Sequence, residues 1–172
     1  MSNGIKVKKR NGRGTEALNL EKMHKMVEEA TKGIAGVSAS QVEIQSGIQF
    51  YDGITTAEIQ EILIKSASDL IDLENPNYQF VAARLLLFSL RKSLYGRTRE
   101  LPHLEMQIHQ CIAADVYDSD IYSKYSKEEI DKIDGFIDHS RDFLFTYAGL
   151  RQVADKYLVQ DRSTGQAYET PQ

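Results

Sequence analysis

Basic residues gather at the start of the chain in a pattern that could hold an anion. Five lie within the first fourteen positions with no acid among them: Lys6, Lys8, Lys9, Arg10 and Arg13. A further one, Lys22, falls where the opening turn of a helix is expected, and a cation there opposes the helix dipole. A bound polyphosphate would reverse that penalty, because free backbone N–H groups and the neighbouring cations would point at it. The alternative is a solvated terminus or an edge strand protected by lysine.

The elements expected to position these cations are an N-terminal hairpin and a helix. Residues 5–8 alternate between apolar and polar like a strand, and the turn residues after them allow residues 15–18 to return as the second strand of a hairpin. Asn19 is a good N-cap for a first helix, which Gly33 and Gly36 would end. The cations of the hairpin would then lie beside the start of this helix.

Two further helices are expected after it. Ser38 and Gln41 can open one of them with a capping box, although residues 42–45 also alternate like a strand. Thr55 and Glu58 form a clearer capping box, and the apolar spacing behind them predicts a helix to about residue 71.

A fourth helix is expected to start at Pro76. Arg91 and Lys92 in its last turn suit the helix dipole, and Gly96 can form a left-handed cap. Lys92 could close the anion site if this helix lies antiparallel to the first. Residues 1–96 therefore predict a hairpin with four helices, within a mainly α (α+β) fold.

A polar stretch containing Pro102 is the best candidate for a domain boundary, which divides the chain into residues 1–96 and 97–172. The second region is expected to be helical and to end in a β-hairpin. Its helices are expected near residues 104–112, from residue 126 onward and over 143–157, and its hairpin joins 157–159 to 167–168.

Other reactive residue types favour structural roles. Cys111 is the only cysteine and lies on an apolar stripe, so we expect neither a disulfide nor an activated nucleophile. The four histidines show no paired metal spacing, and the charged run 138–142 is typical of a solvated or ion-paired helix end. We therefore predict no catalytic and no metal-binding residue.

Composition narrows the class of protein. The 172 residues are 41% apolar with a net charge of −4, which is typical of a folded globular chain. No apolar stretch approaches the roughly 20 residues that span a bilayer, and the basic N-terminus has no apolar signal segment behind it. We expect a cytoplasmic protein without a membrane or nucleic-acid partner.

Several motifs together resemble one known family. Val7-x-Lys9-Arg10-x-Gly12 and Glu16-x-x-Asn19-x-x-Lys22 resemble the opening of an ATP-cone, the regulatory nucleotide-binding domain of many ribonucleotide reductases. Later segments resemble the large (alpha) subunit of the class I enzymes, namely residues 50–56, 78–85, 90–96, 138–142 and 156–159. The resemblance covers essentially the whole chain and implies that it stops where the catalytic barrel would begin.

The resemblance also implies an allosteric site for ATP or dATP, with Mg²⁺ as an accompanying cation. Residues matching positions that hold the phosphates are Lys9, Arg10, Lys22 and Lys92. Residues matching contacts to the nucleoside are Glu16, Asn19 and Thr56, and those matching apolar packing around adenine are Val7, Leu18 and Met23. Gln60 replaces a histidine of feedback-inhibited bacterial members, so inhibition by dATP is expected to be weak or absent.

The function implied is allosteric and structural. The partners implied are the remainder of the alpha subunit, either within one polypeptide or as a split-gene product, and a radical-generating small subunit. The whole enzyme would reduce ribonucleotides with a cysteine radical and a cysteine pair, which a single thiol cannot supply, so no activity is expected from residues 1–172 alone. The alternative is a stand-alone nucleotide-sensing or protein-interaction module.

Overall fold

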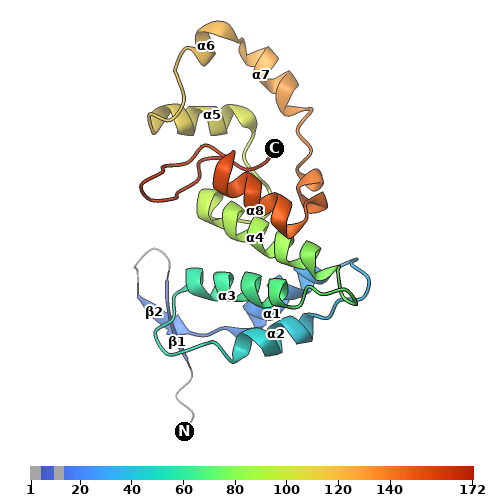
Figure 1. The fold of residues 1–172 in the computed structure, drawn as a ribbon. Helices are drawn as coiled ribbons and strands as arrows, with labels where there is room; N and C mark the ends of the chain where they lie inside the picture. The colour runs from blue at the N-terminus through green and yellow to red at the C-terminus, as the bar shows by residue number, and fades with distance from the viewer. Residues whose placement is uncertain (1–4, 10–13) are drawn as a thin grey trace. The chain divides into compact units, whose positions relative to one another are not determined.

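The computed structural model describes residues 5–9 and 14–172, and helices dominate it (Figure 1). The described elements, in chain order, are β1 (Lys6–Lys8), β2 (Thr15–Ala17), α1 (Leu20–Thr31), α2 (Ala39–Gly47), α3 (Thr56–Asp69), α4 (Tyr78–Tyr95), α5 (Leu104–Ala113), α6 (Ile121–Lys124), α7 (Lys127–Asp134), the 3₁₀ helix η1 (His139–Leu144) and α8 (Tyr147–Lys156). This composition confirms the predicted mainly α class with a small N-terminal β-hairpin.

The chain forms two compact units, and α4 runs from one into the other. The first unit comprises Met1–Ser89 with Phe145–Leu150, and the second comprises Leu90–Leu144 with Arg151–Gln172. The functional division at residue 96 stays a prediction, because this grouping reports packing and not function.

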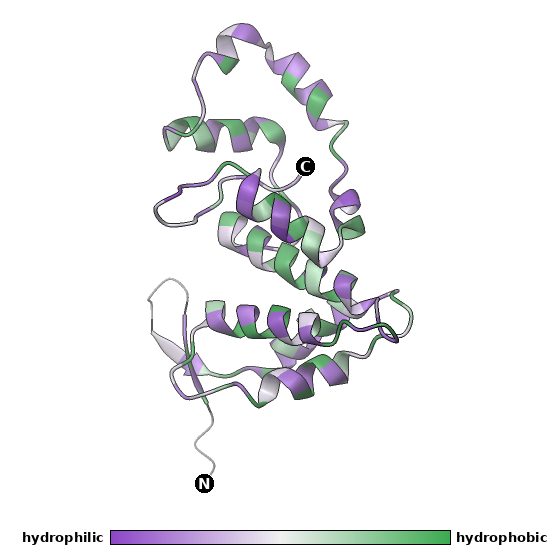
Figure 2. Cartoon of the chain, viewed as in Figure 1, coloured by the Kyte–Doolittle hydropathy of each residue, from purple (hydrophilic) through white to green (hydrophobic). Residues whose placement is uncertain are grey.

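The core of the first unit is built by the apolar stripes of α1, α3 and α4. Fully or almost fully buried side chains from these helices include Val27, Ala30, Leu63, Ala67, Tyr78, Val81 and Ala82. Figure 2 shows that α4 is apolar along most of its length, as expected of a helix that packs on more than one side.

Helix starts follow their capping residues closely. Asn19 caps α1, Ser38 caps α2, and Thr55 with Glu58 forms the complete predicted capping box at α3. At α2 the helical interpretation is confirmed, but the Gln41 side chain does not complete a box. It accepts a hydrogen bond from the Tyr78 hydroxyl of α4 instead.

The ends of the helices also follow local chemistry. Gly33, Gly36 and Gly96 all have positive φ, which a residue without Cβ adopts without strain. Helix α4 begins at Tyr78 rather than at Pro76, while its end at Tyr95 before Gly96 agrees with the prediction.

In the second unit, Ser126 and Glu129 form a second complete capping box, at α7. Helix α6 and the 3₁₀ helix η1 were not anticipated from the sequence, and the predicted helix over 143–157 is shorter, as α8. The expected C-terminal hairpin is reduced to one antiparallel bridge, between Gln160 and Ala167. A backbone bond of 2.9 Å from Tyr168 N to Val159 O continues that pairing.

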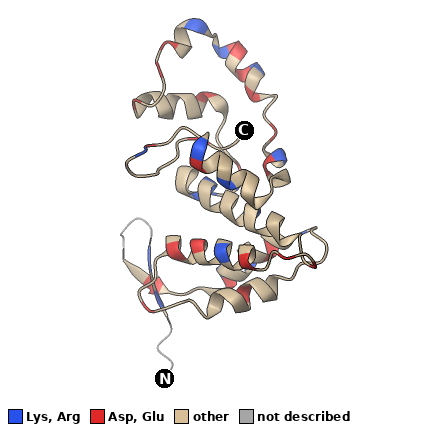
Figure 3. Cartoon of the chain, in the orientation of Figure 1, with Lys and Arg blue, Asp and Glu red and all other residues tan. Residues whose placement is uncertain are grey.

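Charged residues lie mainly on the outside of both units, and Figure 3 shows basic residues along β1. Within the described part of the chain, no helix is both long and apolar enough to cross a membrane.

Candidate functional site

Strand β1 is held on both of its edges by backbone hydrogen bonds. On one side it pairs antiparallel with β2, with Val7 opposite Glu16. On the other side, the N–H of Gly53 donates to Lys6 O and the N–H of Lys8 donates to Ile54 O, both at 2.8 Å. Because α3 begins at Thr56, these bonds fix the start of α3 beside the hairpin.

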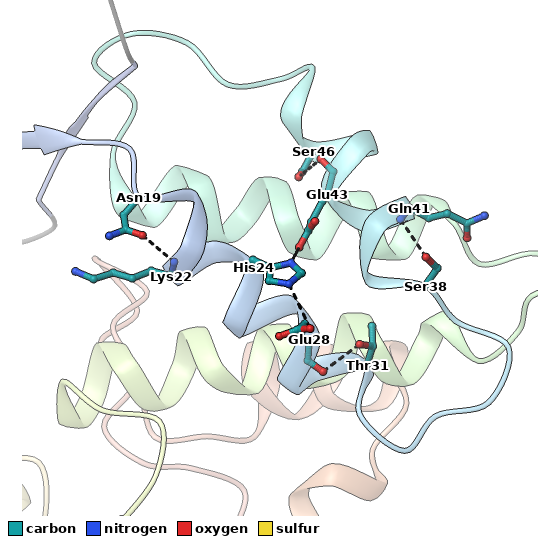
Figure 4. Close-up of polar contacts among 9 residues, drawn as sticks. All are labelled: Asn19, Lys22, His24, Glu28, Thr31, Ser38, Gln41, Glu43 and Ser46. Carbon is teal, nitrogen blue, oxygen red and sulfur yellow. Dashed lines mark hydrogen bonds and ion pairs between the residues drawn. The ribbon is translucent and has the colours of Figure 1, made fainter.

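The start of α1 is attached to the same hairpin. The N–H of Leu18 donates to Ile5 O at 2.8 Å, and Asn19 then opens the helix. Its Oδ1 accepts a 2.9 Å bond from the N–H of Lys22, and the Lys22 side chain extends away from the helix near Asn19 (Figure 4). The hairpin therefore gathers the N-termini of two helices, and both ends favour an anion.

The first turn of α1 is not wholly basic. Glu21 lies beside Lys22 in that turn, and its carboxylate accepts a 2.7 Å bond from Lys25 one turn later. This acid partly offsets the cost of Lys22 at the positive end of the dipole. The net cost of Lys22 is therefore smaller than its own charge implies.

Two predicted ligand contacts, Lys9 and Glu16, face each other across the hairpin. Lys9 Nζ lies 3.2 Å from Glu16 Oε2, and both side chains are a little under half exposed. A phosphate bound at Lys9 would therefore compete with this carboxylate. Arg10, also predicted to bind phosphate, lies outside the described residues.

The predicted apolar contacts include two buried residues. Val7 is 3% exposed and Met23 is 9% exposed, while Leu18 is half-buried at the end of the hairpin. Val7 and Met23 thus already serve as core residues, and only the edges of their side chains can pack against a base.

Gln60 lies one turn after Thr56 on α3 and is 5% exposed. Its Oε1 accepts a 3.4 Å bond from Ser89 of α4, and its Nε2 lies 3.9 Å from the sulfur of Met26 of α1. The amide therefore joins three helices beneath the site. A ligand that contacts Gln60 would have to share these partners.

At the start of α3, Glu58 turns its carboxylate back onto the helix end. It accepts hydrogen bonds from the N–H of Thr55 at 2.8 Å and from the hydroxyl of Tyr51 at 2.7 Å. Hydrogen bonding with Thr55 and Tyr51, with the nearby charge of Lys8, lowers the pKa of Glu58. This carboxylate stays ionised and counters the positive character of the start of α3, whereas Lys22 adds positive charge at the start of α1.

An ionic link between α1 and α2, made by His24 with Glu43 and called the strap below, was not predicted from the sequence. His24 Nδ1 lies 2.7 Å from Glu43 Oε1, and its Nε2 lies 3.2 Å from Glu28 Oε1 (Figure 4). Hydrogen bonding to Glu43, followed by the charge of Glu28, raises the pKa of His24. The spacing of His24 and Glu28 could have indicated half of this strap, but nothing local points to Glu43.

Lys92 is exposed near the end of α4 and belongs to the second unit. Its participation with the residues of the hairpin and α1 stays a prediction. Among the described residues, no cluster of three or more histidine, cysteine or acidic side chains could hold a metal ion.

Residues 5–93 match the family model described as the ATP cone domain, which is more than half of the chain. The chain therefore belongs to the ATP-cone family. The matched segment contains the hairpin, the starts of α1 and α3, and all of α4 except its last two residues.

Individual relatives extend the similarity over the second unit. The chain is 46% identical over all 172 residues to the ribonucleoside-diphosphate reductase 1 subunit alpha of Escherichia coli, and 45% identical over the same length to the subunit alpha of Haemophilus influenzae. The subunit alpha of Enterobacteria phage T4 is 47% identical over 139 residues, which are 80% of this chain and 18% of that protein. The chain spans 22% of the length of the two bacterial relatives. Its N-terminal and second regions are thus both similar to the N-terminal part of reductase alpha subunits.

Proposed function

We propose that this chain is a nucleotide-sensing, regulatory portion of a ribonucleoside-diphosphate reductase alpha subunit and that it binds ATP or dATP. The observation that carries the proposal is the ATP-cone match over the segment in which the hairpin gathers the starts of α1 and α3. Similarity over the full 172 residues favours a reductase component over a stand-alone sensor, which has no need of the second region.

In the proposed complex, the triphosphate lies at the start of α1. Lys22 and the free N–H groups of the first turn supply charge and donors, while Lys9 exchanges Glu16 for a phosphate oxygen. The remaining residues proposed to bind the phosphates are Arg10 and Lys92. Mg²⁺ would neutralise the part of the triphosphate's negative charge that these cations do not. ATP and dATP carry the same triphosphate, so both are expected to bind.

The nucleoside is proposed to lie along the hairpin. Asn19 and Thr56 present polar groups at the two helix starts, and Glu16 on β2 adds a carboxylate beside Lys9. The edges of Val7, Leu18 and Met23 offer apolar surface for adenine, and Gln60 is a buried polar group on α3. Recognition would combine charge at one end with packing at the other, as nucleotide sites generally do.

Reductase chemistry is proposed only for an assembly with the remainder of an alpha subunit and a radical-generating small subunit. The single thiol of the chain, Cys111, is buried, and this burial raises its pKa. It lies 3.2 Å from Gln107 Nε2 and cannot be both radical site and redox pair. The chain alone is expected to have no reductase activity.

Calorimetry of the purified chain with Mg-ATP and with dATP tests the proposal. Both nucleotides are expected to release heat, and each should displace the other from one site. Absence of heat and of competition at millimolar concentrations would show that the cone is only structural. A titration with GTP tests whether adenine is recognised, since the phosphates alone would bind GTP equally well.

A further inference from the structure

The edge of β1 that faces away from β2 is completed by a side chain. The N–H of Lys6 donates to Asp52 Oδ1 at 2.8 Å. The next donor along this edge, the N–H of Lys8, uses a backbone acceptor instead, the carbonyl of Ile54. The Asp52 carboxylate thus takes the place of a strand carbonyl and extends the pairing of β1 with residues 52–54 to the beginning of the strand.

Residues 52 and 53 hold Lys6 by both of its backbone groups. Asp52 accepts from its N–H, and the N–H of Gly53 donates to its carbonyl. Gly53 has a φ of +85°, a conformation in which a residue with a Cβ is strained. A Cβ there would still lie 3.9 Å from Lys8 Cε, so the backbone conformation and not a lack of space requires glycine.

Strand β1 carries two of the residues proposed to bind the nucleotide, Val7 and Lys9. Val7 is paired with Glu16 of β2, and directly paired residues have their side chains on the same face of a sheet. The ion pair between Lys9 and Glu16 places Lys9 on that face as well. Holding the backbone of Lys6 therefore fixes the direction in which this face of the hairpin points.

The segment that holds β1 leads directly into α3. Thr55 caps this helix, and Thr56, a proposed contact to the nucleoside, is its first residue. Thr55 also forms a parallel bridge with Lys8. The bonds along this edge of β1 therefore set the distance between the hairpin and Thr56.

The charge of Asp52 does not explain its presence here. Asp52 adds a negative charge to a region that is proposed to bind a triphosphate, so its electrostatic effect on the nucleotide is unfavourable. A favourable contribution to binding has to come from the hydrogen bond that the carboxylate accepts.

We propose that Asp52 is a positioning residue for nucleotide binding: by accepting a hydrogen bond from Lys6 it holds the hairpin beside the start of α3, so that Val7, Lys9 and Thr56 meet one ligand. The inference rests on the proposed function, in which these three residues contact ATP or dATP. Asp52 acts through β1 and touches no atom of the nucleotide.

Two substitutions of Asp52 separate its geometric role from its charge, with calorimetry of the full chain and Mg-ATP as the measurement. Asp52→Ala removes the acceptor and the charge. It should weaken ATP binding by about three- to tenfold, the range expected when one hydrogen bond no longer favours the binding-competent arrangement. Asp52→Asn removes the charge but keeps an oxygen acceptor, so it should bind ATP within about twofold of the unmodified chain or more tightly. A purely electrostatic role would make both variants bind more tightly.

The matched control is Asp69→Ala. Asp69 is exposed near the end of α3 and pairs with Lys65 one turn earlier, at 2.8 Å. This variant changes the net charge as Asp52→Ala does, but it removes no bond to β1. It should bind ATP within about twofold of the unmodified chain.

Two results would overturn the inference while leaving the proposed function intact. One is a folded Asp52→Ala that binds ATP as well as the unmodified chain. The other is an equal loss of affinity in Asp52→Ala and Asp52→Asn, because the acceptor would then not be what matters. An unmodified chain that binds no nucleotide would overturn both the inference and the proposed function.

Hydrogen exchange in the unmodified chain tests the same role without any substitution, and it decides the question if Asp52→Ala does not fold. A nucleotide that is bound more tightly when β1 is held must in turn favour the held arrangement, because coupling is reciprocal. Saturating ATP should therefore slow exchange of the Lys6 N–H, which Asp52 accepts. Unchanged exchange at Lys6 with ATP bound would overturn the role of Asp52.

Discussion

Reversing the charge of Lys22 should separate nucleotide binding from folding, because the two respond in opposite directions. The side chain is exposed, whereas its backbone N–H makes the 2.9 Å capping bond to Asn19. Lys22→Glu therefore keeps the cap. A glutamate in the first turn suits the helix dipole, which should stabilise the fold by about 0.3–1 kcal/mol. A second acid beside Glu21 also gives Lys25 another partner on the same face.

The effect on binding is larger and has the opposite sign. A hydrogen bond between a charged donor and a phosphate contributes about 1.5–3 kcal/mol, and its loss alone weakens binding by roughly 10- to 150-fold. Placing a carboxylate beside the phosphates adds repulsion, so the Lys22→Glu chain should bind ATP at least about a hundredfold more weakly. Calorimetry measures the affinity, and urea unfolding measures the stability.

Lys25→Glu is the control for long-range electrostatics, because it changes the net charge equally and lies one turn further along α1. It should weaken ATP binding by no more than about twofold and should lower stability slightly, since it replaces the attraction between Lys25 and Glu21 by repulsion. If Lys22→Glu binds ATP as well as the unmodified chain, the triphosphate does not lie at the start of α1. If it unfolds, the capping and dipole argument is wrong.

Three further predictions concern the helices around the site. The bond to Glu43 raises the pKa of His24 from 6.5, so the strap should stabilise the fold fully below pH 6.5 and lose this effect as the pH rises through the raised pKa. Urea unfolding across this pH range should show the loss of stability. His24→Gln should abolish this pH dependence. Tyr78→Phe should lower the free energy of unfolding by about 0.5–1.5 kcal/mol, because it removes the buried hydroxyl that donates to Gln41 and accepts from the N–H of Ser38, and chemical denaturation measures the change. Gln60→His should raise the affinity for dATP relative to ATP, since histidine can carry charge toward an anionic ligand, and equal ratios in competition calorimetry would contradict this.

Much of the first unit follows from local sequence because its helices begin at side-chain caps. A capping residue and its partner lie three positions apart, so Asn19, Thr55 and Glu58 carry their information within one turn. Alternation at residues 5–8 and the turn residues after them were sufficient to predict the hairpin, but not its register. The candidate site residues came instead from the family resemblance, and only the cations of the hairpin, Lys22 and Lys92 were also indicated by local charge.

What the sequence did not indicate depends on contacts between distant residues. The choice between helix and strand at residues 42–45 is made by burial of Val42 and Ser46, which are four apart. The C-terminal segment lies against α5, where Gln107 donates to the carbonyl of Tyr168. This side-chain hydrogen bond fixes the segment without a long strand pairing. Neither spacing nor composition signals a partner that lies 61 positions away.

The ion pair between Lys9 and Glu16 would reduce the affinity of the proposed site for a nucleotide, because a phosphate has to displace the Glu16 carboxylate. Both side chains are more than 40% exposed, and an ion pair of this kind is worth about 0–1 kcal/mol. Displacing the carboxylate therefore reduces affinity for a phosphate by at most about fivefold. In the proposed complex, Glu16 would therefore be a weak competitor of the phosphate, and most of the affinity is expected to come from Lys22 and the free N–H groups at the start of α1.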